Sequence, residues 1–245
     1  MTKPFNPPPA DRSDETRKRI LRAAVREFSE HGLAGARTDA IALAAKVNKA
    51  LLYYYFKSKE ALYTAALEEV FDRVVEDTAG VLALRCSPGE HVLRLALSHF
   101  DRLLSQTEFQ ALMHQEMVRF RQGKSTTLHT IARTAFRGLL EKMQEMVEEG
   151  VRAGELCPVD PMQVLYSAFG HNVFYFLSAP MIQLALPRYD PLATSAIAFR
   201  RTASIRFLGS ALFVDRAYGA ELAQRVLATT PMPVIKKLSS RRKDL

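Results

Sequence analysis

A short stretch of the chain gathers side chains that are suited to contacting nucleic acid. Asn48 and Lys49 stand at the predicted start of a helix, where free amide groups and the helix dipole favour phosphate. The tyrosines at 53–55 follow, and offer ring faces to thymine methyls or sugars and hydroxyls to phosphates. Lys59 adds a cation close to the start of the next helix. These residue types in this order indicate a surface that contacts DNA.

The alternative for this stretch is a tyrosine-rich core helix with incidental cations. Consecutive helical residues point about 100° apart, so three neighbouring tyrosines cannot all face one core. Leu51 can touch a thymine methyl but cannot hydrogen-bond a base edge. We therefore favour a helix that reads DNA.

Three predicted helices position these side chains. Apolar residues recur at helical spacing from about Asp14 to His31, and Gly32 ends that helix. Thr38 is predicted to cap a short second helix, which a tight turn at 46–48 joins to the third. Two helices joined in this way have the spacing of a helix-turn-helix, in which the second helix enters the major groove.

Helical patterns continue along the rest of the chain. Ser58 is predicted to cap a long helix running to about Leu84. A capping residue followed by proline predicts further helix starts at Ser87, Asp160 and Asp190. The remaining patterns lie near 88–106, 108–122, 124–153, 160–178 and 191–214. Because no segment alternates convincingly with period two, the predicted fold class is all-α.

The run TDAIALAAKVNKALLYYYFKSKEAL, residues 38–62, resembles the DNA-binding domain of TetR/AcrR-family transcriptional regulators. The family pattern is a helix-starting Thr, an Ile-Ala pair, then Val-Ser-x-Gly-x-Leu-Tyr-x-Tyr-Phe and Lys-Glu-x-Leu. The resemblance covers roughly residues 14–62, and its anchor residues recur at fixed spacing. Lys46 stands where the family usually has a turn glycine, so we expect either a side-chain-bearing residue at positive φ or a slightly different turn.

The resemblance implies roles for individual positions. Residues matching family positions that clamp phosphates are Thr38, Tyr53 and Lys59. Residues matching positions that face the groove are Asn48, Lys49, Leu51 and Tyr54. The resemblance also implies that a long helix joins this domain to a larger helical domain for ligand binding and dimerisation.

The charge distribution supports a contact with a polyanion near one end. Residues 1–60 hold 12 Lys and Arg against 7 Asp and Glu, and 236–245 are also basic, whereas the body between them is nearly neutral. For 236–245 alone, a solvated tail is the simpler interpretation. The predicted organisation is a flexible arm (1–13), a helix-turn-helix domain (14–60), an effector-binding and dimerisation domain (61–230) and a basic tail (231–245).

Two later helical segments are predicted to form a dimer surface. A helix-turn-helix that reads a palindrome usually works as a twofold dimer with recognition helices about 34 Å apart. The segments are 161–178 and 191–214, and an intrachain core is the alternative. The candidate residues are Val164, Leu165, Ala168, Phe169, Ile205, Leu208 and Leu212.

The middle helices carry a stripe of aromatic and methionine side chains. Methionine beside aromatic rings suits a cavity for varied apolar molecules, although ordinary core is the commoner outcome. Glu116 and Arg119 are possible polar handles in the same region. The predicted effector-pocket residues are Phe109, Met113, His114, Met117, Phe120, Phe136 and Tyr175.

Several other classes are weighed and set aside. Residues 161–187 lack charge and are long enough to span a bilayer. Polar residues interrupt this segment, however, and Pro180 is expected to break the helix. A buried helix is therefore favoured over a helix that crosses a membrane. Two cysteines, no paired metal ligands, no nucleotide or hydrolase motif and no apolar leader predict a cytoplasmic protein with no metal, cofactor or catalytic activity.

The sequence thus predicts a homodimeric transcriptional regulator. It would bind double-stranded operator DNA, most simply as a repressor, and be released by a largely apolar small molecule. A non-specific architectural DNA-binding protein and a membrane-associated helical protein are the alternatives.

Overall fold

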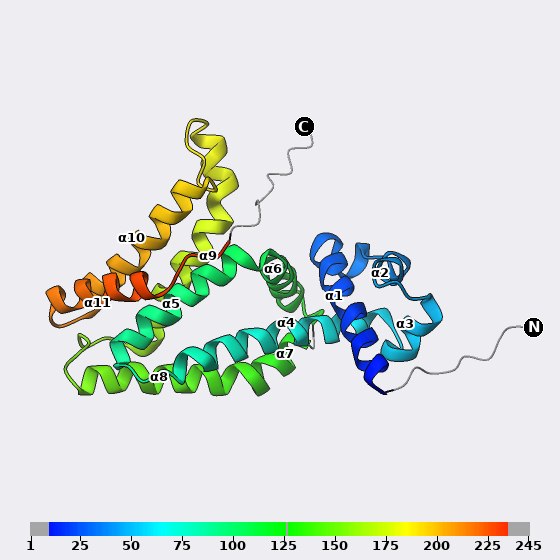
Figure 1. Cartoon of the computed structure of the whole chain (residues 1–245), viewed down its shortest axis with the longest axis horizontal. Coiled ribbons are helices and arrows are strands. Elements are labelled where there is room, and N and C mark those ends of the chain that lie inside the picture. The colour runs from blue at the N-terminus through cyan, green and yellow to red at the C-terminus, as the bar shows by residue number, and fades with distance from the viewer. Residues whose placement is uncertain (1–9, 126, 235–245) are drawn as a thin grey trace, which may run out of the picture. The chain divides into compact units, whose positions relative to one another are not determined.

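The structure is a computed structural model, and it describes residues 10–125 and 127–234. Over these ranges the regular elements are helices, and one isolated antiparallel bridge joins Leu156 to Phe213 (Figure 1). The all-α prediction is therefore confirmed. Most of the predicted arm (1–9) and of the basic tail (235–245) lies outside the described residues.

The chain divides into two compact units. Unit 1 takes in the described residues up to Val75 together with Glu108–Phe136, and unit 2 takes in Glu76–Thr107 and the described residues from Arg137 onward. This division follows packing within one chain. The boundaries predicted from the sequence at 60 and 230 stay predictions.

Unit 1 contains the predicted helix-turn-helix and a second group of helices. Its elements are α1 (Ala10–Gly35), α2 (Thr38–Ala44), α3 (Lys49–Phe56), the first part of α4 (Lys59–Leu82), nearly all of α6 (Thr107–Arg121), α7 (Thr127–Ile131) and a π-helical turn, η1 (Ala132–Phe136). Phe28, Ile41 and Leu52 are completely buried in one core, and Leu112 of α6 lies in that same core. The helices of the predicted helix-turn-helix thus share a hydrophobic core with α6.

Gly32 ends the regular part of α1, as predicted. Its backbone angles, φ 66° and ψ 175°, leave the helical region. Residues with a side chain rarely adopt such angles, so glycine is required at this bend. The following residues lead directly into α2.

Unit 2 contains the end of α4 and the remaining helices. These are α5 (Pro88–Ser105), α8 (Arg137–Arg152), α9 (Pro161–Ala185), α10 (Thr194–Leu212) and α11 (Arg216–Thr229). Side chains of α5, α8, α9, α10 and α11 form its main core. Gly209 and Gly219 allow α10 and α11 to approach closely, because a Cβ atom on Gly209 would lie 2.5 Å from the Gly219 carbonyl oxygen.

Two of the three predicted helix starts are confirmed. The Ser87 hydroxyl accepts a hydrogen bond from the Glu90 amide, and the Asp160 carboxylate accepts one from the Gln163 amide. The start predicted at Asp190 is wrong, because α10 begins at Thr194. Asp190 accepts instead from the Leu192 amide, a local bond that favours a turn over a helix.

Two other expectations about the later helices need correction. Helix α9 continues through Pro180 to Ala185. Pro180 lies on the exposed side, while neighbouring Ser178 and Ala179 stay buried, so packing offsets the local cost of the proline. The helix predicted over 124–153 is divided into α7, η1 and α8. Within the described ranges, none of the helices is both long and apolar enough to cross a membrane.

Candidate nucleic-acid interface

A tight turn sets α3 against α2. The Val47 amide donates to the Ala42 carbonyl at 2.9 Å, and the Lys46 amide donates to the Leu43 carbonyl at 3.1 Å. Lys46 has φ 55°, which confirms the expectation of a side-chain-bearing residue at positive φ. The turn therefore keeps helix-turn-helix geometry without the usual glycine.

Asn48 caps α3. Its Oδ1 accepts a hydrogen bond from the Leu51 amide at 2.7 Å. This bond occupies the side-chain oxygen and leaves the exposed Nδ2 amino group available as a donor. If Asn48 reads a base edge, it does so as a donor to an acceptor such as guanine O6 or thymine O4.

The remaining side chains of α3 divide between core and surface. Leu52 and Phe56 are buried in the unit 1 core, four residues apart on one side of the helix. On other sides, Lys49 is exposed, Tyr54 is 45% exposed and Leu51 is half-buried. The four residues assigned to the groove thus include three exposed side chains on a helix whose opposite side is anchored.

The tyrosines at 53–55 point in different directions, as the helical geometry predicts. Tyr53 and Tyr55 pack against the unit 1 core, and the Tyr55 hydroxyl donates to Ser13 Oγ at 3.0 Å. Tyr54 faces outward, with its ring edge against Tyr55. Of the three rings, Tyr54 is therefore the one best placed to meet a ligand.

Two of the residues assigned to phosphate lie together. Thr38 Oγ1 and the Tyr53 hydroxyl are 3.3 Å apart, so both hydroxyls meet where α2 approaches α3. Thr38 is the first residue of α2, and Arg37 is the N-cap, which corrects the predicted capping role of Thr38. Lys59 is separate from this pair, and its Nζ donates to the Ala34 carbonyl at 3.2 Å.

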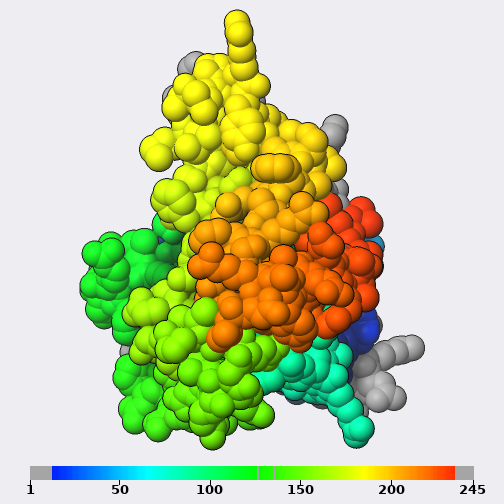
Figure 2. Space-filling view, turned by 90° about the vertical axis from the view of Figure 1, so that its left-hand side faces the viewer, coloured from blue at the N-terminus to red at the C-terminus, as the bar shows by residue number. Residues whose placement is uncertain are grey.

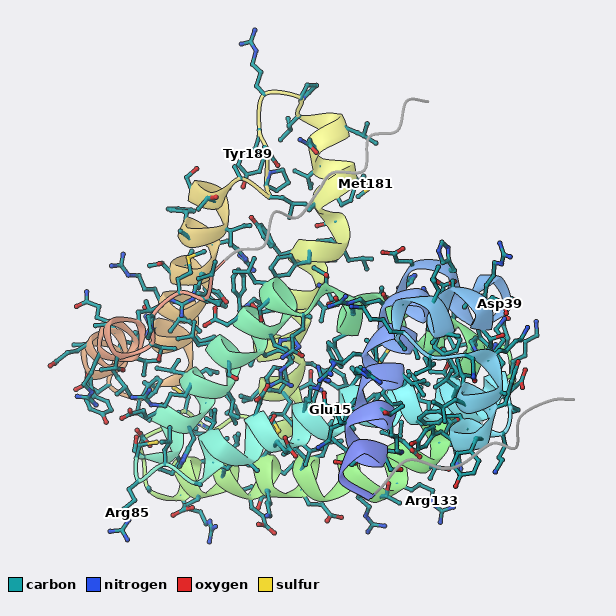
Figure 3. All side chains as sticks on the ribbon, turned by 45° about the vertical axis from the view of Figure 1, so that its right-hand side comes forward. Glu15, Asp39, Arg85, Arg133, Met181 and Tyr189 are labelled. Atoms are coloured by element: carbon teal, nitrogen blue, oxygen red, sulfur yellow. The ribbon has the colours of Figure 1, made fainter. Side chains whose placement is uncertain are left out.

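Lys49 is held by an acid that the sequence analysis did not single out. Its Nζ lies 3.0 Å from Asp39 Oδ1 and 3.2 Å from Oδ2. Asp39, labelled in Figure 3, projects from the first turn of α2. The Asp39–Lys49 pair places a negative charge beside the groove-facing end of α3, where a phosphate backbone would repel it. Its position in the first turn of the preceding helix was the available signal.

Lys57 is a second residue that the sequence analysis missed. It follows α3 at φ 55°, its Nζ donates to the Tyr54 carbonyl at 3.1 Å, and it lies 5.5 Å from the centre of the Tyr54 ring. Lys57 therefore supports Tyr54 and adds an exposed cation at the end of the helix. Its place directly after the last buried residue of α3 was the only signal in the sequence.

Comparisons with known proteins agree with this geometry. A family model described as "Bacterial regulatory proteins, tetR family" matches residues 20–66, and one described as "Tetracyclin repressor-like, C-terminal domain" matches residues 88–206. The solved protein SCO4942 from Streptomyces coelicolor is 30% identical, covering 78% of this chain and 97% of that one, with a TM-score of 0.54. This chain belongs to the TetR/AcrR family of transcriptional regulators.

Two further relatives of this TetR/AcrR protein align with a similar share of the chain. A solved TetR/AcrR-family regulator from Thermobifida fusca is 26% identical, covering 79% of this chain and 96% of that one, with a TM-score of 0.59. The HTH-type transcriptional repressor NicS of Pseudomonas putida is 29% identical over 70% of this chain and 85% of its own length. The protein is thus a DNA-binding transcriptional regulator, and α1–α3 form its helix-turn-helix region.

The predicted effector-pocket residues of this TetR/AcrR regulator are distributed over both units. Phe109 and Met113 pack against the unit 1 core, whereas the side chains of Met117 and Phe120 are exposed. His114 and Phe136 are exposed too, and Tyr175 belongs to a small cluster in unit 2. None of the seven lines the cavity of about 420 Å³ that the structure contains in unit 2. Their role in effector binding stays a prediction.

Glu116, a possible polar handle, is instead engaged within unit 1. It is 1% exposed, and it accepts hydrogen bonds from the Tyr63 hydroxyl at 2.7 Å, from Arg119 Nε at 3.2 Å and from Ser125. Burial, together with this carboxylate, raises the pKa of Tyr63. The cluster ties α4 to α6, so Glu116 and Arg119 act here as structural groups.

The predicted dimer residues lie inside one chain. Six of the seven are buried, and Phe169 packs against the same unit 2 core. The surfaces of α9 and α10 carry other apolar side chains, many of them more than half exposed: Tyr166, Val173, Phe174, Leu177, Met181, Leu184, Leu186, Phe199 and Phe207. We call this set the α9–α10 apolar face. The seven predicted residues therefore pack within one chain, as the alternative interpretation held. The same two helices still expose an apolar surface that a partner could cover.

Proposed function

We propose that this TetR/AcrR regulator is a cytoplasmic repressor that binds a palindromic operator as a homodimer and is released by a small-molecule effector. The observation that carries the proposal is α3, which has a buried Leu52–Phe56 side and an exposed side with Asn48, Lys49 and Tyr54. A helix anchored in this way can enter the major groove without losing its core. The name of the relative NicS, a transcriptional repressor, favours repression.

The proposed contacts divide by chemistry. Thr38, Tyr53 and Lys59 bind phosphates and set the register of the protein on the duplex, because hydroxyls and amines near the backbone carry no sequence information. A separate set reads base edges and thymine methyls in the groove. That set comprises Asn48, Lys49, Leu51 and Tyr54.

The α9–α10 apolar face supports homodimerisation. Segment 161–187 contains no charged residue, and its exposed positions include Phe174, Leu177 and Met181. In Figure 2 the surface of α9 and α10 is seen in yellow and orange, and the end of α9 projects from unit 2 at the top. Met181 and Tyr189, labelled in Figure 3, lie at this projecting end. Large apolar side chains exposed in such number are typical of a protein interface.

Release by an effector follows from linkage. An effector that binds better to the dimer with displaced recognition helices lowers operator affinity, and operator DNA must weaken effector binding by the same factor. Induction would therefore require a difference in affinity between two conformations, and no direct contact between effector and DNA is needed.

Selection of bound duplexes from a random pool at about 150 mM salt tests the proposal, because non-specific phosphate binding is suppressed there. We expect an enriched palindrome whose half-sites lie one helical turn apart. The double variant Lys49→Ala, Tyr54→Ala should enrich this palindrome only weakly. As the control, Lys142→Ala in α8 should enrich the palindrome as strongly as the wild type does. Binding without enrichment that fades as salt rises would instead establish an architectural DNA-binding protein.

A further inference from the structure

Unit 2 contains a cavity of about 420 Å³ beside α4 and α5. Its lining includes Asp77 and Val81 from α4, Leu84 just after that helix, Asp101 and Arg102 from α5, and Thr230 after α11. Ligand sites in proteins commonly have volumes of about 300–1,000 Å³, so this cavity can hold a small organic molecule.

Arg102 is the unusual group in this lining. Its side chain is 6% exposed, yet its Nε has no hydrogen-bond partner among the described residues. The nearest carboxylate is that of Asp77, which is half exposed and 3.8 Å away, beyond hydrogen-bonding distance. A guanidinium stays charged in proteins, and a buried charge without a good partner is costly.

Two other charged groups of the lining, Asp101 and Arg94, have close partners. Asp101 receives two hydrogen bonds from Arg201, at 2.7 and 2.8 Å, and Arg201 also donates to the Thr230 carbonyl. Arg94 lies 2.6 Å from Glu90. Of the two arginines in the lining, Arg102 is therefore the one without a close partner.

We propose that this cavity binds a small organic acid whose carboxylate pairs with Arg102. The inference deepens the effector-binding part of the proposed function and rests on it for the consequence at the operator. Arg102 Nε is itself inaccessible, so the carboxylate accepts from a terminal amino group of the guanidinium, and this charge-assisted bond supplies the partner that Arg102 lacks.

The other residues that line the cavity limit the chemical class of ligand that it can bind. Val81 and Leu84 offer apolar contacts to the body of the acid, and Ser98 and Gln106 offer polar ones. Asp77 and Asp101 also line the cavity, and they would repel a doubly charged anion such as phosphate. One available cation between two acids suits a monocarboxylate with an apolar body.

Calorimetric titration of the full-length protein tests the proposal. The probes are benzoate, phenylacetate and hexanoate, each paired with its neutral amide, with inorganic phosphate as a further probe. We expect saturable binding of at least one acid, and binding of its amide weaker by about tenfold or more, because a hydrogen-bonded charge is lost. Absence of acid binding, equal binding of acid and amide, or preferential binding of phosphate would each overturn the proposal.

Variants locate the site. Arg102→Met should abolish acid binding, and Arg102→Lys should weaken it because lysine lacks the planar fork. Arg225→Met, which removes an arginine of unit 2 outside the cavity lining, should bind the acid as the wild type does. Unchanged binding in Arg102→Met would refute the assignment.

A second measurement avoids the question of whether the Met variant folds. In the wild-type protein, the Arg102 Nε–H resonance, assigned from its absence in Arg102→Lys, should shift on adding the acid and saturate with the calorimetric affinity. A resonance that does not move would contradict the pairing. Acid binding is read without DNA, so loss of operator binding alone would count against the proposed function and leave this site intact.

Discussion

At the scale of single residues, the DNA-facing helix is governed by a few polar contacts. Asn48 Oδ1 accepts a hydrogen bond from the Leu51 amide of α3, and Lys49 forms an ion pair with Asp39. Exposed ion pairs contribute little to stability, about 0–1 kcal/mol, so the effect of Asp39 should be felt mainly in DNA binding.

Neutralising that acid should strengthen DNA binding. Asp39→Asn frees Lys49 and removes a negative charge beside the phosphate backbone, so operator affinity should rise by about two- to fivefold, in keeping with surface electrostatic effects of up to about 1 kcal/mol. Fluorescence anisotropy with the selected operator would measure it. The exposed acid Glu141 of α8 provides the control, since Glu141→Gln should leave the affinity unaltered. Weaker binding by Asp39→Asn would mean that this acid orients Lys49 for its base contact.

Phosphate contacts and base contacts should respond differently to mutation. Lys59→Ala should weaken binding to all duplexes about equally and reduce the salt dependence by one phosphate contact. Tyr54→Ala should instead lose discrimination at particular base pairs, by about 1–3 kcal/mol each. Titrations against single-base operator variants at several salt concentrations separate the two patterns. If both variants behaved alike, the division of roles between them would be wrong.

At the scale of elements, a buried polar network joins three helices of unit 2. Asn172 of α9 donates to the Ala96 carbonyl and to His99 Nδ1, both on α5, and Ser204 of α10 donates to Asn172. His171, the residue before Asn172 in α9, also hydrogen-bonds to Ser204. Satisfied networks of this kind fix how helices pack, because an unpaired member would be costly.

This network predicts a loss of stability in acid. Burial, with smaller effects of Arg102 and His171, lowers the pKa of His99 to about 3, and burial also lowers the pKa of His171. The unfolded chain takes up a proton at a pKa of about 6.5, so His99 favours the folded state fully above that pH and progressively less between about 6.5 and 3.

Urea unfolding at pH 7.5 and pH 5 would measure that loss. The His99 contribution alone amounts to about 2 kcal/mol, at about 1.4 kcal/mol per pH unit below 6.5. His99→Gln should lessen the difference between the two pH values, whereas His129→Gln, at an exposed position, should not. An equal pH dependence in wild type and His99→Gln would show that His99 is not the group responsible.

At the scale of the whole molecule, the α9–α10 apolar face is an apolar surface that remains exposed to solvent in a single chain. Its members belong to the same two helices as the buried residues Val164 and Ile205, but to their outer sides. These helices therefore carry apolar side chains on more than one side. A helix that is apolar all round is typical of a buried environment, which a second chain would provide.

Charge placed on this face should prevent dimerisation. Leu177→Glu would bury a carboxylate in the proposed interface, and a loss of about 2 kcal/mol or more corresponds to a dimer at least about 30-fold weaker. Sedimentation velocity would follow the shift to monomer, and operator affinity should fall with it. Lys142→Glu on α8 is the control and should remain dimeric. A Leu177→Glu protein that stays dimeric would place the interface elsewhere.

The helix-turn-helix was readable from the amino-acid order because its signals are local. Asn48 at the start of α3, the turn at 46–48 and the spacing of Leu52 and Phe56 act within a few positions of one another, and the structure keeps each of them. The cap predicted at Thr38 is the exception. The family resemblance rests on the same short range. The amino-acid sequence could not show which distant residues form hydrogen bonds after folding, such as Tyr63 with Glu116 and Asp101 with Arg201.

The same limit explains why the sequence did not show that the predicted dimer residues are buried within one chain, and why it gave no sign of the cavity. Apolar spacing identifies α9 and α10 as helices, but whether Leu165 or Leu177 meets the core depends on how α5, α8 and α11 pack around them. In the sequence Arg102 is like any helical arginine, and only folding buries it and pairs the neighbouring Asp101 with Arg201 instead. Burial and charge pairing are properties of the packed chain, and they arise only when distant segments exclude solvent together.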